Sequence, residues 1–335
     1  MTRGIYNNIQ EHPEYNSSEK HWHITLDQSM FFWYDLIVDP PEGVLNAIKD
    51  SINNFKNYVN QTNEKKFIYF FTSRKKVRFN INKQPRTSFF NKRILFVYFL
   101  VGSKNKKIGI SYNDTDGIPK KVRVDEKFIY FSYEVDNEIA YSIHDFIKIG
   151  NISLGIESEI HYVGITADPV KRTLSRSHRG YADMLYNVST SENDIFLTIS
   201  TFKVMSHTKI ASHNIDILTT NSMVYDIHLD KEGAIIEKSL IHYFDTKCQE
   251  VDKNAKGEFK NLFLKEMKSK NINSVSFHLE MNESTEYDVI GSRYIPPNVS
   301  HSFMWELNNN QLELTKFNSE IELLEKNKVF CLNSI

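Results

Sequence analysis

The stretch YVGITADPVKR, residues 162–172, predicts a strand, a close turn and the start of a helix within a short span. Tyr162 stands where a strand would end, and Gly164 permits the close approach of another part of the chain. Asp168 followed by a proline is typical of a helix start, because aspartate accepts a hydrogen bond from a free backbone N–H and proline fits the first turn. The helix would carry Arg172, so we expect a phenol and a guanidinium at one cleft.

A second helix is expected at KEGAIIEKSLIHYFD, residues 231–245, where apolar residues recur every three or four positions. This helix carries Glu237. Hydrolysis of a phosphodiester requires a carboxylate that holds a metal ion, a group that takes a proton from water, and a cation near the developing charge. Tyr162, Arg172 and Glu237 together supply these three groups, which makes them the candidate catalytic residues.

These motif blocks, in this order, resemble those of the GIY-YIG endonuclease superfamily over about residues 128–262. In that family a Tyr-Ile-Gly strand end is followed by an arginine on the first helix and by a glutamate that opens a later helix. The resemblance implies a small antiparallel sheet flanked by helices, and cleavage of DNA. It also implies that Tyr162 activates or orients the attacking water, that Arg172 contacts the scissile phosphate, and that Glu237 holds one divalent cation, Mg²⁺ or Mn²⁺.

The first tyrosine block of the family pattern has no literal match at the expected distance. The Gly-Ile-Tyr at residues 4–6 lies over 150 residues before Tyr162, too far for the short hairpin of the family, and we interpret it as a coincidence. Tyr130, within KFIYFSYEV, is preferred for this position over Tyr141. Tyr130 requires an enlarged insertion in the hairpin.

Two further positions of the family pattern have more than one candidate. His178 resembles a histidine that some restriction-enzyme branches place near the tyrosine, and Arg176 occupies the commoner position of that histidine. The late asparagine of the family has three candidates, which are Gln249, Asn254 and Asn261.

Positive charge is concentrated before these motifs. Residues 65–107 hold thirteen basic side chains and no acidic one. Because each phosphate neutralised by lysine or arginine releases a counterion, we expect this stretch to bind nucleic acid with a steep dependence on salt. Phe79, Phe89 and Phe90 are expected either to stack on bases or to lie in the core. The candidate nucleic-acid-binding residues are Arg74, Lys75, Lys76, Arg78, Arg86, Lys92 and Arg93, together with Arg176.

The pattern of short β-type runs and amphipathic helices predicts an α+β protein of three parts. Residues 1–126 are expected to form a basic α+β module that binds nucleic acid, with an amphipathic helix at 42–60. Residues 127–265 would form the GIY-YIG-like catalytic domain, and residues 266–335 a β-rich C-terminal extension.

The composition is that of an ordinary globular protein, with 335 residues, 40% apolar and 25% charged side chains. No apolar run is long enough for a membrane span, and two cysteines are too few for a disulfide framework. We therefore predict a soluble cytoplasmic protein without a membrane partner. Paired cuts in duplex DNA by a one-metal domain require two active sites, so a homodimer is expected for that activity.

The favoured function is divalent-metal-dependent hydrolysis of DNA, with DNA preferred over RNA, in restriction or defence. One alternative is a catalytically inactive nucleic-acid-binding protein with a degenerate nuclease fold. Another is a cupin-type metal enzyme, because IGSRYIPPNVSHSF, residues 290–303, resembles a cupin motif in which His301 would bind the metal.

Overall fold

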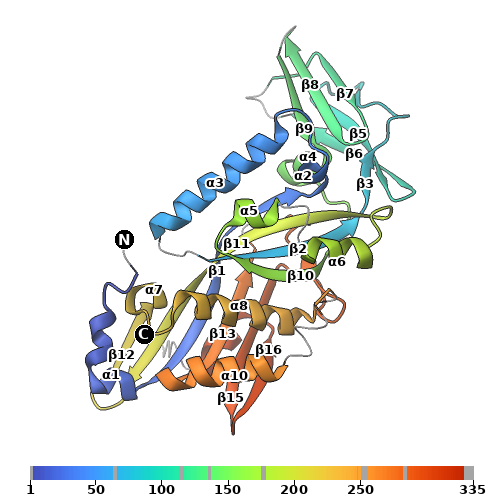
Figure 1. Ribbon diagram of the computed structural model, residues 1–335. Helices are drawn as coiled ribbons and strands as arrows, with labels where there is room; N and C mark the ends of the chain where they lie inside the picture. Colours follow the sequence, from blue (N-terminus) through green and yellow to red (C-terminus); the bar gives the residue numbers. More distant parts are fainter. Residues whose placement is uncertain are drawn as a thin grey trace.

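The computed structural model describes residues 3–62, 66–112, 117–134, 137–174, 179–246, 248–249, 256–281 and 285–327. Within this part of the chain, nine strands form one mixed sheet that runs through the molecule (Figure 1). Neighbouring strands are antiparallel, except that β1 runs parallel to β13 and β10 runs parallel to β14. The order along the sheet is β14 (Ile290–Gly291), β10 (Ser158–Thr166), β2 (Phe67–Lys75), β11 (Asn193–Ile210), β1 (Glu19–Trp33), β13 (Ile272–Glu280), β15 (Ser300–Asn308) and β16 (Gln311–Phe317), with β12 (Ile215–Thr220) beside β11.

This sheet corrects the predicted division into three parts. It takes β1 and β2 from the first predicted part, β10 to β12 from the second and β13 to β16 from the third. The boundaries at residues 126 and 265 therefore separate strands that are hydrogen-bonded in one sheet. The α+β class is confirmed, whereas the boundaries are wrong, because pairing between distant segments leaves no mark in the local sequence pattern.

Helices cover both faces of the sheet. On one face, α3 packs its buried residues against Phe67, Tyr69 and Phe71 of β2. On the other face, α8 and α10 run together across the sheet (Figure 1) and share a core with Ile68 and Phe70. The helices are η1 (Asn7–Glu11), α1 (Pro13–Ser17), α2 (Asp35–Val38), α3 (Val44–Thr62), α4 (Ile143–Ile149), α5 (Pro169–Thr173), α6 (Arg179–Asn187), α7 (Asn221–Val224), α8 (Leu229–Phe244), α10 (Lys256–Glu266), η2 (Lys268–Lys270) and α11 (Glu320–Asn327).

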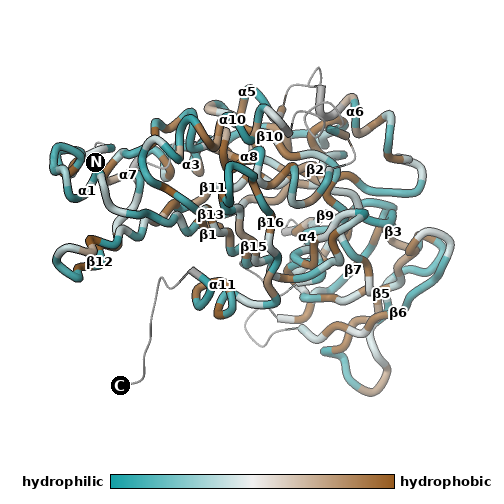
Figure 2. The backbone as a smooth tube through the Cα atoms, turned by 90° about the horizontal axis from the view of Figure 1, so that it is seen from below, coloured by the Kyte–Doolittle hydropathy of each residue, from teal (hydrophilic) through white to brown (hydrophobic). Residues whose placement is uncertain are grey.

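A long insertion separates β2 from β10, although these two strands pair directly. It forms two small sheets, in which β5 buries alternate residues while β6 leaves most of its residues accessible. Figure 2 shows the corresponding alternation of hydrophobic and hydrophilic stretches along β5 and β6. One small sheet comprises β3 (Val77–Phe79), β4 (Arg86–Thr87), β5 (Ile94–Val101) and β6 (Lys104–Ser111), and the other comprises β7 (Lys121–Val124), β8 (Phe128–Glu134) and β9 (Asn137–Ser142).

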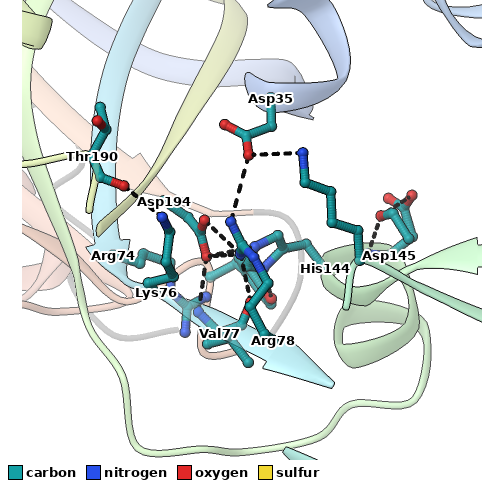
Figure 3. A network of polar contacts seen from close by, with 12 residues as sticks. Asp35, Arg74, Lys76, Val77, Arg78, His144, Asp145, Thr190 and Asp194 are labelled. Carbon is teal, nitrogen blue, oxygen red and sulfur yellow. Dashed lines mark hydrogen bonds and ion pairs between the residues drawn. The ribbon is translucent and has the colours of Figure 1, made fainter. Parts of the chain in front are cut away.

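A buried polar network joins this insertion to β11 (Figure 3). Asp194 is 1% exposed and accepts hydrogen bonds from Nη1 of Arg78 at 2.8 Å and from the backbone N–H of Val77 at 2.9 Å. Its Oδ2 lies 3.1 Å from Nε2 of His144, whose Nδ1 lies 2.8 Å from the hydroxyl of Tyr287. Burial acts to raise the pKa of Asp194, but the bond to His144 and the charge of Arg78 hold that pKa below its usual value.

Substitution Asp194→Asn should lower the free energy of unfolding by about 2 kcal/mol at neutral pH, because buried donors lose a charged acceptor. The pKa of this carboxyl is lower in the folded chain than in the unfolded one. Its stabilising contribution is therefore present above the usual value of 3.8 and is lost as the pH falls through the folded-state pKa. Urea titrations of the wild type and the variant at neutral pH and at several acidic pH values measure the difference in their free energies of unfolding. A difference that is the same at every pH would contradict the electrostatic origin of the effect.

Candidate active site

Two tyrosines stand side by side on β2 and β10. In the antiparallel pairing, Tyr69 lies opposite Gly164 and Phe71 lies opposite Tyr162. Alternate residues of a strand share a face, so Tyr69 and Tyr162 project to the same side of the sheet. Their rings stack with centroids 5.9 Å apart and an interplanar angle of 22°. The tyrosine beside Tyr162 therefore comes from β2.

Gly164 makes room for this pair. A methyl group at this position would overlap Cζ and Oη of Tyr69, and it would lie 2.8 Å from Cε1 of Tyr162. The glycine in the Tyr-Val-Gly motif is required here for side-chain space, because the phenol of Tyr69 lies directly over its α-carbon. The sequence predicted close approach at this glycine, and the approaching group is the second tyrosine.

Substitution Gly164→Ala should lower the free energy of unfolding by about 1–3 kcal/mol, the usual effect of overpacking a filled site. It should also move the Tyr69 hydroxyl away from its partners. Urea unfolding of the purified chain measures the first effect. Gly257→Ala is the matched control, because a methyl group there meets nothing within 4 Å and alanine favours the helix. Equal stability of the two variants would contradict the packing argument.

The hydroxyl of Tyr69 is the hydrogen-bonding centre of the cluster. It accepts hydrogen bonds from the hydroxyl of Tyr162 and from the guanidinium of Arg172. Burial raises the pKa of Tyr69, while these two bonds and the charge of Arg172 oppose the rise. Burial, together with the neighbouring Tyr69, also raises the pKa of Tyr162. Tyr69 is thus the phenol whose oxygen is best placed to carry negative charge.

Arg172 is positioned by the start of α5. Asp168 is the N-cap, and its Oδ1 accepts a hydrogen bond from the backbone N–H of Lys171 at 3.4 Å, as the sequence predicted. The same oxygen forms an ion pair at 3.3 Å with Nζ of Lys56 on α3. The cap and the ion pair together fix where the short helix begins, and Arg172 follows within its first turn.

Glu237 reaches the cluster from α8. It is half-buried, and its negative charge contributes to raising the pKa of both Tyr69 and Tyr162. The helix lies close against β10, because a methyl group at Gly233 would overlap Cδ1 of Ile165. The structure therefore joins Tyr162 and Arg172 to Tyr69 by hydrogen bonds and places Glu237 close enough to act electrostatically on both phenols.

Gln249 holds the strand that carries Tyr162. Its Oε1 accepts from the backbone N–H of Val163 at 2.7 Å, and its Nε2 donates to the carbonyl of the same residue at 2.8 Å. The backbone N–H of Cys248 donates to the carbonyl of His161 at 3.0 Å. Cys248 and Gln249 therefore supply hydrogen-bond partners for the backbone groups of β10 on both sides of Tyr162. Among the candidates for the late asparagine that the structure describes, Gln249 contacts the motif strand, and Asn261 lies exposed on α10.

Tyr130 is a correction. It lies on β8 in a different sheet, where its hydroxyl donates to Oδ2 of Asp125 at 2.8 Å and the guanidinium of Arg123 lies 3.7 Å from its ring centre. Tyr141, the alternative, lies on β9 of that same sheet and packs its ring against Phe131. The long insertion of this chain lies between β2 and β10, and it contains Tyr130 itself.

Four further sequence candidates have different outcomes. His178, Arg176 and Asn254 lie outside the described residues. His301 is 5% exposed, with its Nδ1 3.0 Å from the hydroxyl of Tyr243 and its Nε2 2.9 Å from the carbonyl of Ile290. Both ring nitrogens of His301 are thus engaged, which argues against a cupin-type metal site. In the part of the chain that is described, no three histidine, cysteine, aspartate or glutamate side chains are grouped to hold a metal ion.

Two of the predicted nucleic-acid-binding arginines, labelled in Figure 3, have side chains that are only 2% and 14% exposed, which is a second correction. Arg74 is 3% exposed and forms an ion pair with Glu286 at 2.6 Å. Arg78 forms an ion pair with Asp194 at 2.8 Å. Arg78 fastens β3 of the insertion to β11, whereas the pair of Arg74 with Glu286 joins β2 to the segment before β14. In both cases a guanidinium removed from water is stabilised by a carboxylate beside it. The acidic partners come from distant segments, so a count of local charge misses them.

The other predicted cations lie at the surface. Lys75, Arg86, Lys92 and Arg93 are exposed, and Lys76 is partly exposed with its Nζ donating to the carbonyl of Thr190 at 2.6 Å. Among the aromatic residues of the same stretch, Phe79 belongs to the core, whereas Phe89 and Phe90 are 94% and 97% exposed.

Comparisons with family models, with curated proteins and with solved structures find no match to this chain. No helix among the described residues is long and apolar enough to cross a membrane.

The residue that the sequence prediction missed is Tyr69. It lies in KFIYFFTS, residues 66–73, and the same five letters KFIYF recur at residues 127–131 around Tyr130. The repeated string was the available signal, but only the pairing of β2 with β10 decides which copy meets the motif.

Proposed function

We propose that this protein is a divalent-metal-dependent endonuclease that hydrolyses DNA. The observation that carries the proposal is the cluster of Tyr69, Tyr162, Arg172 and Glu237, drawn from β2, β10, α5 and α8. Phosphodiester hydrolysis places negative charge on the attacked phosphate and removes a proton from water. The cluster combines a cation, two hydrogen-bonded phenols and a carboxylate at one place.

The tyrosine pair serves the attacking water. In its ionised form Tyr69 would accept the water's proton, and the hydrogen bonds from Tyr162 and Arg172 would stabilise the negative charge of that form. Tyr162 would hold that oxygen in place through its hydrogen bond. Arg172 lies exposed at the same oxygen. Its remaining N–H groups would donate to the phosphate and stabilise the charge that develops there.

Glu237 would hold the metal ion. Magnesium keeps several waters and binds through one or two carboxylates together with substrate phosphates, so one half-buried carboxylate within electrostatic range of the two phenols fits this ion. When bound, the ion would supply neutralising charge for the phosphate. Burial raises the pKa of both phenols, and the charge of Glu237 adds to that rise.

The exposed cations of the insertion support DNA as the substrate. Lys75, Arg86, Lys92 and Arg93 lie on the surface of a stretch without acidic residues. A surface of this kind attracts a polyanion, and its affinity for the polyanion falls steeply as the salt concentration is raised. Restriction or defence is the biological setting that we propose for such an activity, and paired cuts in a duplex would require a homodimer.

The test is incubation of supercoiled plasmid with the full chain in magnesium or manganese. Nicked or linear product that disappears with EDTA supports the proposal. Retarded migration of the plasmid without cleavage in either ion would contradict it and would favour a nucleic-acid-binding protein with an inactive site.

A further inference from the structure

The loop between β4 and β5 presents two aromatic rings to solvent. Phe89 and Phe90 are 94% and 97% exposed, and their ring centres lie 5.6 Å apart at an angle of 89°. Each fully exposed phenylalanine forgoes a substantial gain from burial of its apolar surface. Two such rings in sequence therefore form an apolar tip without a covering group in the described part of the chain.

This loop is held in shape by its own backbone. The N–H of Ser88 donates to the carbonyl of Ile94 at 2.8 Å, and the N–H of Ile94 donates to the carbonyl of Asn91 at 2.9 Å. The side chain of Asn91 accepts from the N–H of Arg93, also at 2.9 Å. Because the loop is closed by these bonds, less conformational freedom is lost when its tip binds a partner.

The residues that flank the tip in the sequence are cationic. Arg86 precedes the two rings, Lys92 and Arg93 follow them, and all three side chains are exposed. The sequence from 65 to 107 contains no acidic residue. A partner that fits must therefore offer flat apolar surface between negative charges, which is the chemistry of bases between phosphates.

We propose that the β4–β5 loop is a base-contacting element, in which Phe89 and Phe90 stack on or between bases while Arg86, Lys92 and Arg93 hold the flanking phosphates. Stacking on exposed rings tolerates any base, so the loop anchors the nucleic acid without reading a sequence. Insertion at a base step would also kink a duplex. The choice of nucleic acid over an anionic lipid surface rests on the proposed nuclease function.

The experiment uses the full chain in EDTA, so that binding is measured without turnover. Short DNA duplexes and single strands carry 2-aminopurine, whose fluorescence reports unstacking. We expect the wild type to change this fluorescence. Phe89→Ala with Phe90→Ala should abolish the change and weaken affinity by at least about tenfold, with the slope of affinity against salt retained. Phe89→Trp with Phe90→Trp should restore both.

Two sets of controls define the outcome. Tyr294→Ala removes a 57% exposed ring beside Arg293 at another site and should leave affinity and fluorescence unchanged. Lys92→Ala with Arg93→Ala should reduce the salt slope by about two while keeping a fluorescence change at low salt.

Unchanged DNA affinity and fluorescence in the double alanine variant would overturn the inference. If that variant at the same time lost cosedimentation with phosphatidylserine vesicles that the wild type shows, a membrane would be the partner instead. Failure of plasmid cleavage with an intact fluorescence response would contradict the nuclease proposal and leave this inference standing.

Discussion

Substitution Glu237→Gln should reduce plasmid cleavage in magnesium by at least about a hundredfold while leaving duplex binding intact. The amide keeps the shape of the side chain but loses the charge that would hold a divalent cation beside the phosphate. Removal of a negative charge near the binding site should leave affinity in EDTA equal or slightly higher. Timed plasmid digestion and fluorescence anisotropy measure the two quantities separately.

Glu258→Gln is the matched control for this experiment. Glu258 lies on α10, its side chain is 76% exposed, and it forms an ion pair with Lys238 at 3.9 Å. An exposed ion pair of this length contributes little, so cleavage should stay within about twofold of the wild type. Full activity of Glu237→Gln would remove the carboxylate from the proposed mechanism.

Substitution Tyr69→Phe should also lower cleavage by at least about a hundredfold, with little change in DNA affinity. The substitution removes the oxygen that accepts from both Tyr162 and Arg172, while the ring that fills the space over Gly164 stays. Because the pKa of Tyr69 is raised above its usual 10.0, only a small fraction is ionised at neutral pH. The wild-type rate should therefore rise with pH over the neutral to alkaline range, and the variant should lose this part of the rise.

Tyr130→Phe provides the comparison that separates the two tyrosines. Both residues sit in the string KFIYF, and both have a hydroxyl engaged by a neighbour. Tyr130, however, bonds to Asp125 in a separate sheet, so its variant should keep the wild-type rate and pH profile. A loss of cleavage in Tyr130→Phe together with normal cleavage in Tyr69→Phe would reverse the assignment.

Local elements of the fold were predictable because their patterns are local. The amphipathic helix expected at 42–60 is α3, with Ile48, Ile52, Phe55 and Val59 buried. The capped start at Asp168 and the helix that carries Glu237 are also present. In each case, side-chain spacing or capping chemistry within a few residues determines the structure.

The global arrangement was not predictable in the same way. The parallel pairing of β1 with β13 joins segments about 250 residues apart, and the local sequence of neither strand identifies its pairing partner. The same limitation applies to the site. Tyr162, Arg172 and Glu237 were identifiable by chemical type and order, whereas Tyr69 depended on a strand pairing across the insertion. Arg74 and Arg78 were misassigned because their carboxylate partners are equally remote in sequence.

The position of β1 between β11 and β13 has a consequence for synthesis on the ribosome. β1 begins at residue 19, yet its neighbours begin at residues 193 and 272. For most of translation the backbone groups along both edges of this long strand have no strand to pair with. The helices that cover its apolar side chains are also synthesised later. Closure of the sheet over such separations is slow, because loop entropy must be lost before the contacts form. β1 therefore has no strand neighbour until β11 has been synthesised, and its second neighbour follows only after residue 272.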